Sequence, residues 1–195
     1  YTYPDTVKLR GYKPTVTGNK RQIDKAAKML LRAKRPVFYV GGGTVQSNAS
    51  GELLALAERL QVPVTTTLMA MAAFPQAHPL ALGMLGMHGT YFANMAVTDC
   101  DLLVAVGARF DDRVTGRIDA FASKAKVIHI DIDPTSIKKN VRVDLPIVGD
   151  LRDVLQNMLK KLAEQGDAVE SLVERTAPWR AEIDEWKKKH PLTYK

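Results

Sequence analysis

Apolar residues recur along the chain with two different periods, and this alternation predicts its elements. Helical spacing first appears after Asn19, and Pro36 prevents that helix from continuing. Its predicted buried face consists of Ile23, Ala26, Ala27, Leu30 and Leu31. A second helix is expected after Gly43, because Leu53, Leu56, Ala57 and Leu60 repeat the pattern.

Short runs of consecutive apolar residues lie between these helical stretches and predict strands. The predicted strands are Val37–Val40, Val62–Thr67, Asp101–Val106, Lys126–Asp131 and Pro146–Val148. Unbroken apolar runs indicate burial on both faces of a sheet, and intervening helices indicate parallel pairing through right-handed crossovers. We therefore predict a doubly wound α/β fold, a Rossmann-like and mostly parallel sheet of about six strands with helices on both faces.

Three segments follow from the change in pattern along the chain. Residues 1–18, rich in Tyr, Pro, Thr and Gly, predict an interdomain linker. Residues 19–165 predict a central nucleotide-binding α/β domain, which a helix capped by Asp150 closes. Residues 166–195 predict a helical extension toward a missing domain.

That extension carries a helical pattern that Pro178 is expected to interrupt. Trp179 and Trp186 indicate packing against another surface. Either they lie back on the central domain, or they lead into a domain that follows.

Composition places the chain among ordinary globular proteins. Of 195 residues, 46% are hydrophobic and 25% are charged, which suffices for one core. No apolar run approaches the roughly 20 residues that span a bilayer, so we expect a soluble, cytoplasmic protein with no membrane partner. Cys100 is the single cysteine, so a disulfide within the chain is excluded and a reducing compartment fits.

The net charge of +7 raises the question of nucleic acid. The lysines are scattered along the sequence, however, and the densest cluster, Trp186–His190, is typical of a solvated helix end. We expect no nucleic-acid partner, although a basic balance can attract an anionic cofactor.

Residues that follow the predicted strands are candidates for ligand binding, because open parallel sheets bind ligands beyond their carboxyl ends. Gly41–Gly43 can admit phosphates to backbone N–H groups or form a plain tight turn. Met69 and Met71 can cover a flat ring or fill gaps in the core. The loop Gly83–Thr90 contains His88, for which ligand contact is favoured over proton transfer because no local nucleophile accompanies it.

The stretch Val106–Gly116 concentrates charged side chains after the third predicted strand. Arg109 can bind a diphosphate through paired hydrogen bonds, and Asp111 can orient it. The alternative is an internal ion-pair cluster that stiffens the loop. A Mg²⁺ site on Asp111 and Asp112 is discounted, because adjacent side chains usually point apart.

Acidic residues end the fourth predicted strand. Asp131 occupies the position at which nucleotide-binding folds contact ribose hydroxyls. Asp133 is expected to cap a short helix that begins at Thr135. Gly149 and Asp150 repeat this arrangement after the fifth strand.

In this order, RPVFYVGGG, VTTTLMA, GMLGMHGT, VGARFDDRVTG and HIDIDP resemble the central domain of acetohydroxyacid synthase (acetolactate synthase) large subunits over nearly the whole chain. The family binds FAD in this domain in a largely structural role. By matching position, the resemblance implies FAD contacts from Gly42, Thr67, Leu68, Leu85, Gly86, Met87, His88, Gly107, Ala108, Arg109, Phe110, Asp111, Asp131, Ile132, Asp150 and Leu151. It also implies that Asp112 and Arg113 border the substrate channel.

The family condenses two 2-ketoacids, pyruvate with pyruvate or 2-ketobutyrate, in branched-chain amino acid biosynthesis. Thiamine diphosphate and Mg²⁺ are held by flanking domains of a homodimer or tetramer, which can carry a small regulatory subunit. The activating glutamate and the Gly-Asp-Gly metal motif belong to those domains, and no Gly-Asp-Gly tripeptide occurs in this sequence. We therefore expect no catalytic or metal-binding residue in this chain, and no activity from it alone.

Two other hypotheses remain open. The same fold can bind NAD or ADP, as other dinucleotide-binding domains do. Alternatively, the chain is a non-enzymatic interaction module whose basic surface meets nucleic acid.

Overall fold

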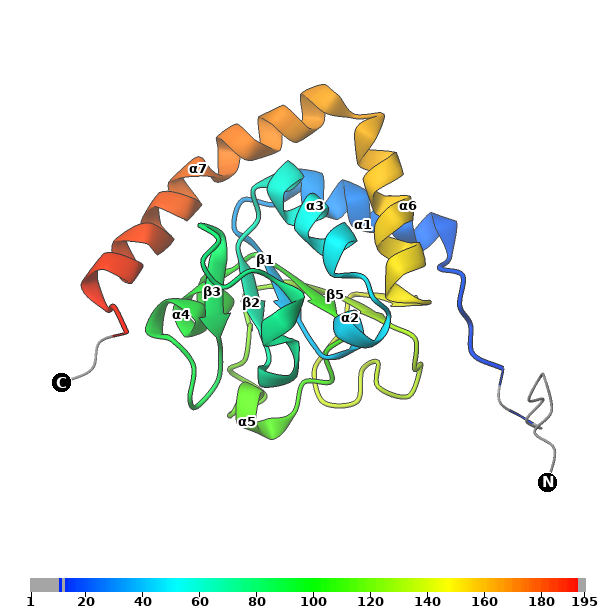
Figure 1. Cartoon of the computed structure of the whole chain (residues 1–195), viewed down its shortest axis with the longest axis horizontal. Helices are drawn as coiled ribbons and strands as arrows, with labels where there is room; N and C mark the ends of the chain where they lie inside the picture. Colours follow the sequence, from blue (N-terminus) through cyan, green and yellow to red (C-terminus); the bar gives the residue numbers. More distant parts are fainter. Residues whose placement is uncertain (1–10, 12, 193–195) are drawn as a thin grey trace.

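The computed structural model describes residues 11 and 13–192, and it confirms the predicted doubly wound α/β fold. Six parallel strands form one sheet in the order β3-β2-β1-β4-β5-β6 (Figure 1). They are β1 (Pro36–Val40), β2 (Val64–Thr66), β3 (Ala81–Met84), β4 (Leu102–Val106), β5 (Lys126–Asp131) and β6 (Leu145–Val148). Of the predicted linker 1–18, residues 1–10 and 12 lie outside the described residues.

Helices cover both faces of the sheet. They are α1 (Lys20–Arg32), α2 (Gly43–Gln46), α3 (Ser50–Leu60), α4 (Tyr91–Asp99), α5 (Asp112–Thr115), α6 (Leu151–Ala163) and α7 (Gly166–Lys189), with a 3-10 helix η1 (Leu68–Ala73). Within the described residues, no helix has the length and apolarity needed to cross a bilayer.

Alternation along each strand divides the core between the two faces. In β1, Phe38 and Val40 pack with α1, α3 and α6, whereas Val37 and Tyr39 pack with α4. All five residues of β1 and of β4 are buried, which agrees with their unbroken apolar sequence.

Strand β3 was absent from the predicted strands. Its sequence, ALGM, is short, and Gly83 within it adopts a φ of +70°, a conformation that interrupts the β pattern. The prediction for Val62–Thr67 was too long, because only Val64–Thr66 pair.

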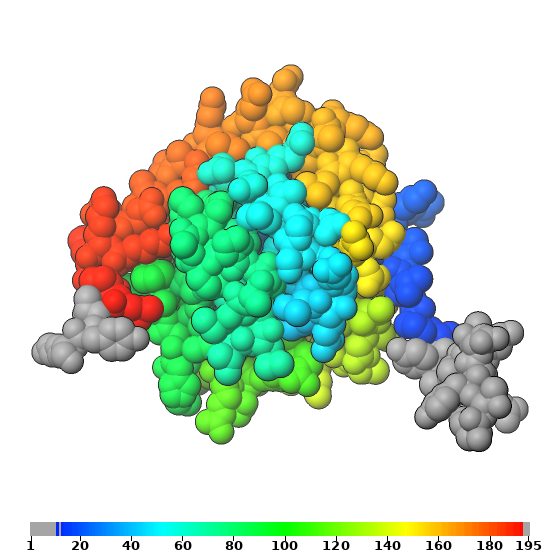
Figure 2. All heavy atoms as spheres, viewed as in Figure 1, coloured from blue at the N-terminus to red at the C-terminus, as the bar shows by residue number. Residues whose placement is uncertain are grey.

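Helix α7 arches over the edge of the sheet beside α3 and α6 (Figures 1 and 2). Trp179 is buried and its indole N–H donates to the Pro36 carbonyl over 3.3 Å, so the tryptophans lie back on this domain. Trp186 packs edge-on against it, with ring centroids 5.6 Å apart.

The predicted interruption at Pro178 is wrong, because α7 continues through it. A proline inside a helix leaves carbonyls of the preceding turn without donors. Arg180 adds hydrogen bonds to the turn before the proline: its guanidinium donates to the Val173 carbonyl over 2.9 Å and to Thr176 Oγ1 over 2.6 Å. Burial of Trp179 next to the proline adds tertiary packing that holds the helix together.

Candidate functional site

A cleft of about 980 Å³ opens beyond the carboxyl ends of the strands, where the winding of the sheet reverses. From β1 the chain winds outward through β2 to β3, and it then returns to place β4 on the other side of β1. Loops that leave β1 and β4 therefore diverge, and ligands of open α/β sheets bind in the space between them. The volume lies at the upper end of the roughly 300–1,000 Å³ typical of ligand sites.

One side of this cleft, here called the glycine wall, consists of Gly41, Gly43 and Gly107. A methyl group on Gly41 would lie 2.1 Å from the Gly107 carbonyl oxygen, and one on Gly43 would lie 3.0 Å from Gly107 Cα. The two strand ends thus pack backbone against backbone, and the Gly43 N–H donates to the Gly107 carbonyl over 3.2 Å. Gly107 also has a φ of +61°, which favours glycine.

Gly42 lies between these contacts and faces the cleft. Its N–H has no acceptor among residues 11 and 13–192, and a methyl group there would meet Met69, at 3.2 Å from Cβ and 3.8 Å from the carbonyl oxygen. The glycines therefore do more than form a tight turn, because Gly42 brings a backbone donor without an acceptor in the described residues to the cleft lining.

A second part of the cleft lining, here called the polar wall, carries Arg109, Asp111 and Asp131. Arg109 Nη2 lies 3.1 Å from Asp111 Oδ2, and the two side chains are 72% and 57% exposed. An ion pair this exposed contributes little stability, so it does not stiffen the loop appreciably. The guanidinium remains accessible to an anion in the cleft.

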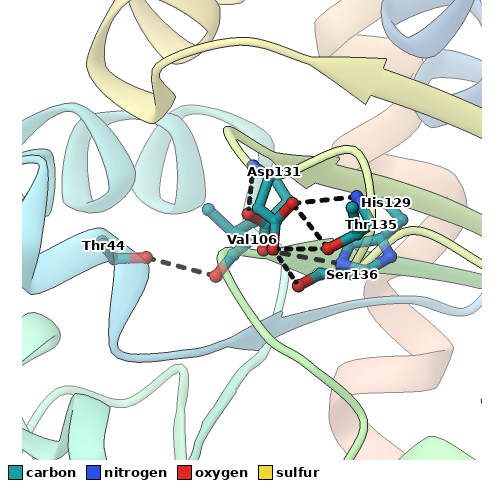
Figure 3. A network of polar contacts seen from close by, with 7 residues as sticks. Thr44, Val106, His129, Asp131, Thr135 and Ser136 are labelled. Atoms are coloured by element: carbon teal, nitrogen blue, oxygen red, sulfur yellow. Dashed lines mark hydrogen bonds and ion pairs between the residues drawn. The ribbon is translucent and has the colours of Figure 1, made fainter. Parts of the chain in front are cut away.

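Asp131 ends β5, and its Oδ1 accepts from the Asp133 N–H over 2.9 Å (Figure 3). The hydroxyls of Thr135 and Ser136 donate to the Asp133 carboxylate over 2.8 and 3.1 Å. The helix predicted from Thr135 is wrong: these residues form turns, because Asp133 binds the hydroxyls as well as the Thr135 N–H.

Buried polar atoms without partners lie behind the polar wall and beside η1. His129 is fully buried, neither ring nitrogen has a hydrogen-bond partner among the described residues, and Nε2 lies 3.9 Å from Asp131 Oδ2 (Figure 3). Burial lowers the pKa of His129, and the negative charge of Asp131 opposes this in part. Thr67 Oγ1 is similarly buried and unpartnered next to the cleft.

The structure brings most of the sequence-predicted site residues together. Those that line the cleft are Gly42, Thr67, Leu68, Leu85, His88, Gly107, Ala108, Arg109, Asp111, Arg113, Asp131, Ile132, Asp150 and Leu151. Asp150 also caps α6 by accepting from the N–H groups of Arg152 and Asp153.

Four predicted residues do not line the cleft: Gly86, Met87, Phe110 and Asp112. Phe110 is buried, and its ring packs against Tyr39 and His129 with centroid separations of 5.3 and 5.1 Å. Gly86 packs against the Arg113 carbonyl, whereas Met87 is 68% exposed.

Several cleft residues were missed in the sequence. Tyr39, Gln46, Ser47, Met84, Val114 and Ser136 also line it. Gln46 and Ser47 follow Gly43 by about one helical turn. A prediction of a short helix directly after the glycines would have placed both residues near the cleft. The interpretation of Met69 and Met71 as core-filling residues is wrong, because they are 76% and 41% exposed.

Among residues 11 and 13–192, no group of three or more His, Cys, Asp or Glu side chains is arranged to hold a metal ion. Cys100 is buried at the end of α4, where burial raises the pKa of its thiol to about 12. The cleft can therefore offer backbone donors, the guanidinium groups of Arg109 and Arg113, and carboxylates, a set suited to a phosphate and hydroxyl-bearing ligand.

Comparison with known proteins identifies a family to which the chain is similar. The family model described as "Thiamine pyrophosphate enzyme, central domain" matches residues 23–158. The "Probable acetolactate synthase large subunit" of Methanocaldococcus jannaschii is 58% identical over 83% of this chain and 27% of its own length. The acetolactate synthase large subunits of Haemophilus influenzae and, as isozyme 3, of Escherichia coli are 48% and 45% identical over the whole chain and 33% of theirs. The chain thus spans about a third of the length of these relatives.

Proposed function

The chain belongs to the family of thiamine pyrophosphate enzyme central domains, in the form found in acetolactate synthase large subunits, and on this premise we propose that its strand-end cleft binds FAD. The observation that carries the proposal is the glycine wall. Gly41 and Gly43 close against Gly107, and Gly42 between them lines a cleft of dinucleotide size.

The donor set of the cleft fits the parts of FAD. Arg109 and the Gly42 N–H would hold the diphosphate, because both are donors of residues that line the cleft at the reversal of the sheet. The carboxylates of Asp131 and Asp150, at the ends of β5 and β6, would accept from ribose or ribityl hydroxyls. The exposed side chains of Leu68 and Met69 would cover the apolar face of a ring.

The flavin has a structural role in this proposal, since it orders the loops on both sides of the cleft without net redox chemistry. Residues Gly86, Met87, Phe110 and Asp112 would approach the ligand only after a shift of the loops that carry them. Asp112 and Arg113 would border the channel to a thiamine site, because α5 begins at the rim of the cleft.

For the whole protein, we propose condensation of two 2-ketoacids, pyruvate with pyruvate or 2-ketobutyrate. The support is the identity to relatives named acetolactate synthase large subunits. Thiamine diphosphate would supply the carbanion chemistry, held with Mg²⁺ by flanking domains in a cytoplasmic homodimer or tetramer with a possible regulatory subunit. The segments 1–18 and 166–195 would connect the central domain 19–165 to those domains.

The 195-residue chain alone would then be inactive. Acetolactate formation from pyruvate, with thiamine diphosphate, Mg²⁺ and FAD supplied, should equal the rate without protein. Measurable turnover by the purified chain would contradict this part of the proposal.

Titration of the chain with FAD tests the cleft directly. Flavin fluorescence should change saturably, and the thermal midpoint should rise, because a ligand that binds only the folded state stabilises it. Gly42→Val should fold, since its new side chain meets only the exposed Met69, which can move, and should lose most of this response. NAD and ADP in the same titration provide the alternative ligands, and displacement of FAD by a lower concentration of either would replace FAD in the proposal.

A further inference from the structure

A second hollow lies at the other edge of the sheet, and the FAD proposal makes no use of it. It has a volume of about 690 Å³ and lies at the amino ends of β4 and β5, beside α1. We call it the basic groove; its lining includes Lys25, Lys28, Arg32, Lys124 and Lys126. These cations are far apart in sequence, and the fold brings them together in one groove.

The cations of the basic groove come from two sides. Lys25, Lys28 and Arg32 occupy one exposed stripe of α1, since they are three and four residues apart. Lys124, in the turn before β5, and Lys126, its first residue, complete the set. Like charges at these helical spacings repel one another, so the arrangement favours an anion that neutralises it.

Most of these cations lack an internal counterion. Within the described part of the chain, no carboxylate lies within ion-pair distance of Lys25, Lys28, Arg32 or Lys126. Lys124 is the exception, with its Nζ 2.7 Å from Asp99 Oδ1.

Two carboxylates also line the groove, but both are engaged with the backbone. Asp101 accepts from the N–H groups of Lys34 and Arg35 over 2.7 and 2.8 Å. Asp144 accepts from the Val127 N–H over 2.9 Å. Both carboxylates fix backbone next to the starts of β1 and β5, and neither forms an ion pair with a lysine of the groove.

The floor of the basic groove is apolar. Leu102 and Ala33 are buried, Met29 is half-buried, and all three line the groove. A groove of this size with cations on two sides and an apolar floor fits a small molecule with more than one anionic group.

We propose that the basic groove binds a compact polyphosphorylated small molecule, in the class of nucleoside diphosphates and sugar bisphosphates. Lys25, Lys28 and Arg32 would hold one phosphate and Lys126 the other. Arg32 can bind phosphate through two parallel hydrogen bonds, whereas the lysines act as point charges. The site lies at the opposite edge of the sheet from the FAD cleft, so both ligands can be bound together.

Inorganic pyrophosphate is the probe for this proposal, followed by calorimetry at low ionic strength. The double variant Lys28→Glu with Arg32→Glu should weaken binding by at least about tenfold, because two attractive charges become repulsive. The matched control is Lys20→Glu with Lys160→Glu, which makes the same change in net charge at exposed residues outside both hollows. It should change the affinity less than about twofold, since screened charges at a distance contribute little.

Backbone amide NMR during the pyrophosphate titration separates the two hollows, since pyrophosphate can also enter the FAD cleft. Saturable shifts should include the amides of Lys28, Arg32 and Lys126. Shifts confined to Gly42, Gly107 and Arg109 would overturn the proposal, as would absence of binding to the unmodified chain or equal losses in the groove variant and its control. Binding of an acidic peptide without pyrophosphate would also overturn it, in favour of a protein partner.

Discussion

The two walls of the FAD cleft are built on different principles, although they meet in one loop, where Gly107 is two residues from Arg109. The glycine wall is fixed by backbone contacts, and Gly41 has no space for even one methyl group. The polar wall is held by an exposed ion pair between Arg109 and Asp111. The comparison teaches that one wall belongs to the stability of the fold, whereas the other is free to be shaped by a ligand.

The largest effect should come from Gly41→Ala in the glycine wall. Its Cβ would lie 2.1 Å from the Gly107 carbonyl oxygen, so β1 and β4 must separate, and the free energy of unfolding should fall by about 3 kcal/mol. Urea denaturation measures this. Gly51→Ala is the control, because nothing lies within 4 Å of its added methyl group in α3, and it should raise stability by up to about 0.5 kcal/mol. A Gly41→Ala protein as stable as the unmodified chain would show that the walls do not differ.

A smaller effect, on binding alone, is expected from Arg109→Ala in the polar wall. FAD affinity should fall about tenfold through loss of a charge-assisted hydrogen bond to phosphate. The free energy of unfolding should change by less than about 0.5 kcal/mol, because the ion pair is exposed.

The chain contains a matched control for this change. Arg117 pairs with Asp119 over 2.6 Å at the same spacing and similar exposure, but it does not line the cleft. Arg117→Ala should therefore leave both FAD affinity and stability unchanged. Equal losses of FAD affinity in the two variants would mean that Arg109 affects FAD binding only through the net charge of the protein.

The smallest effect concerns His129, which lies behind the polar wall. Its pKa is lowered by burial from the ordinary 6.5, so the unfolded chain binds a proton more readily than the folded one. Stability should therefore be full above pH 6.5 and decline as the pH falls below it. His129→Leu should change stability at pH 7 by less than about 1 kcal/mol, because an unpartnered buried imidazole is replaced by an apolar group.

Urea denaturation at several pH values between roughly 5 and 8 checks this prediction. The unmodified chain should lose stability toward the acid end more steeply than the His129→Leu variant does. Parallel pH profiles would show that the pKa of His129 is the same in the folded and the unfolded chain, which contradicts the effect of burial.

The sequence predicted the fold and much of the cleft because both depend on local patterns. Strands that end in glycine or in charged residues, once they are expected to pair in parallel, must bring those residues to one edge of the sheet. Predictions failed where tertiary contacts decide. Helix α7 continues through Pro178, where Trp179 is buried against the domain and Arg180 adds hydrogen bonds to the preceding turn. Gly83, with its positive φ, interrupts the apolar pattern by which β3 could have been predicted.

The basic groove could not be predicted either, because it depends on tertiary structure. Lys28 and Lys126 are almost a hundred residues apart, and only the crossover from α1 into the sheet brings them to one hollow. Charge clusters of this kind carry no local signal. Phe110 was similarly out of reach, since its burial against Tyr39 depends on a positive φ of 55° within the loop.

Backbone amide NMR of the chain during an FAD titration tests most directly whether FAD binds at the strand-end cleft. Shifts should saturate together at the amides of Gly42, Gly107 and Arg109, with no change along Lys25–Arg32. Absence of shifts at millimolar FAD, or shifts confined to the basic groove, would contradict binding at the cleft.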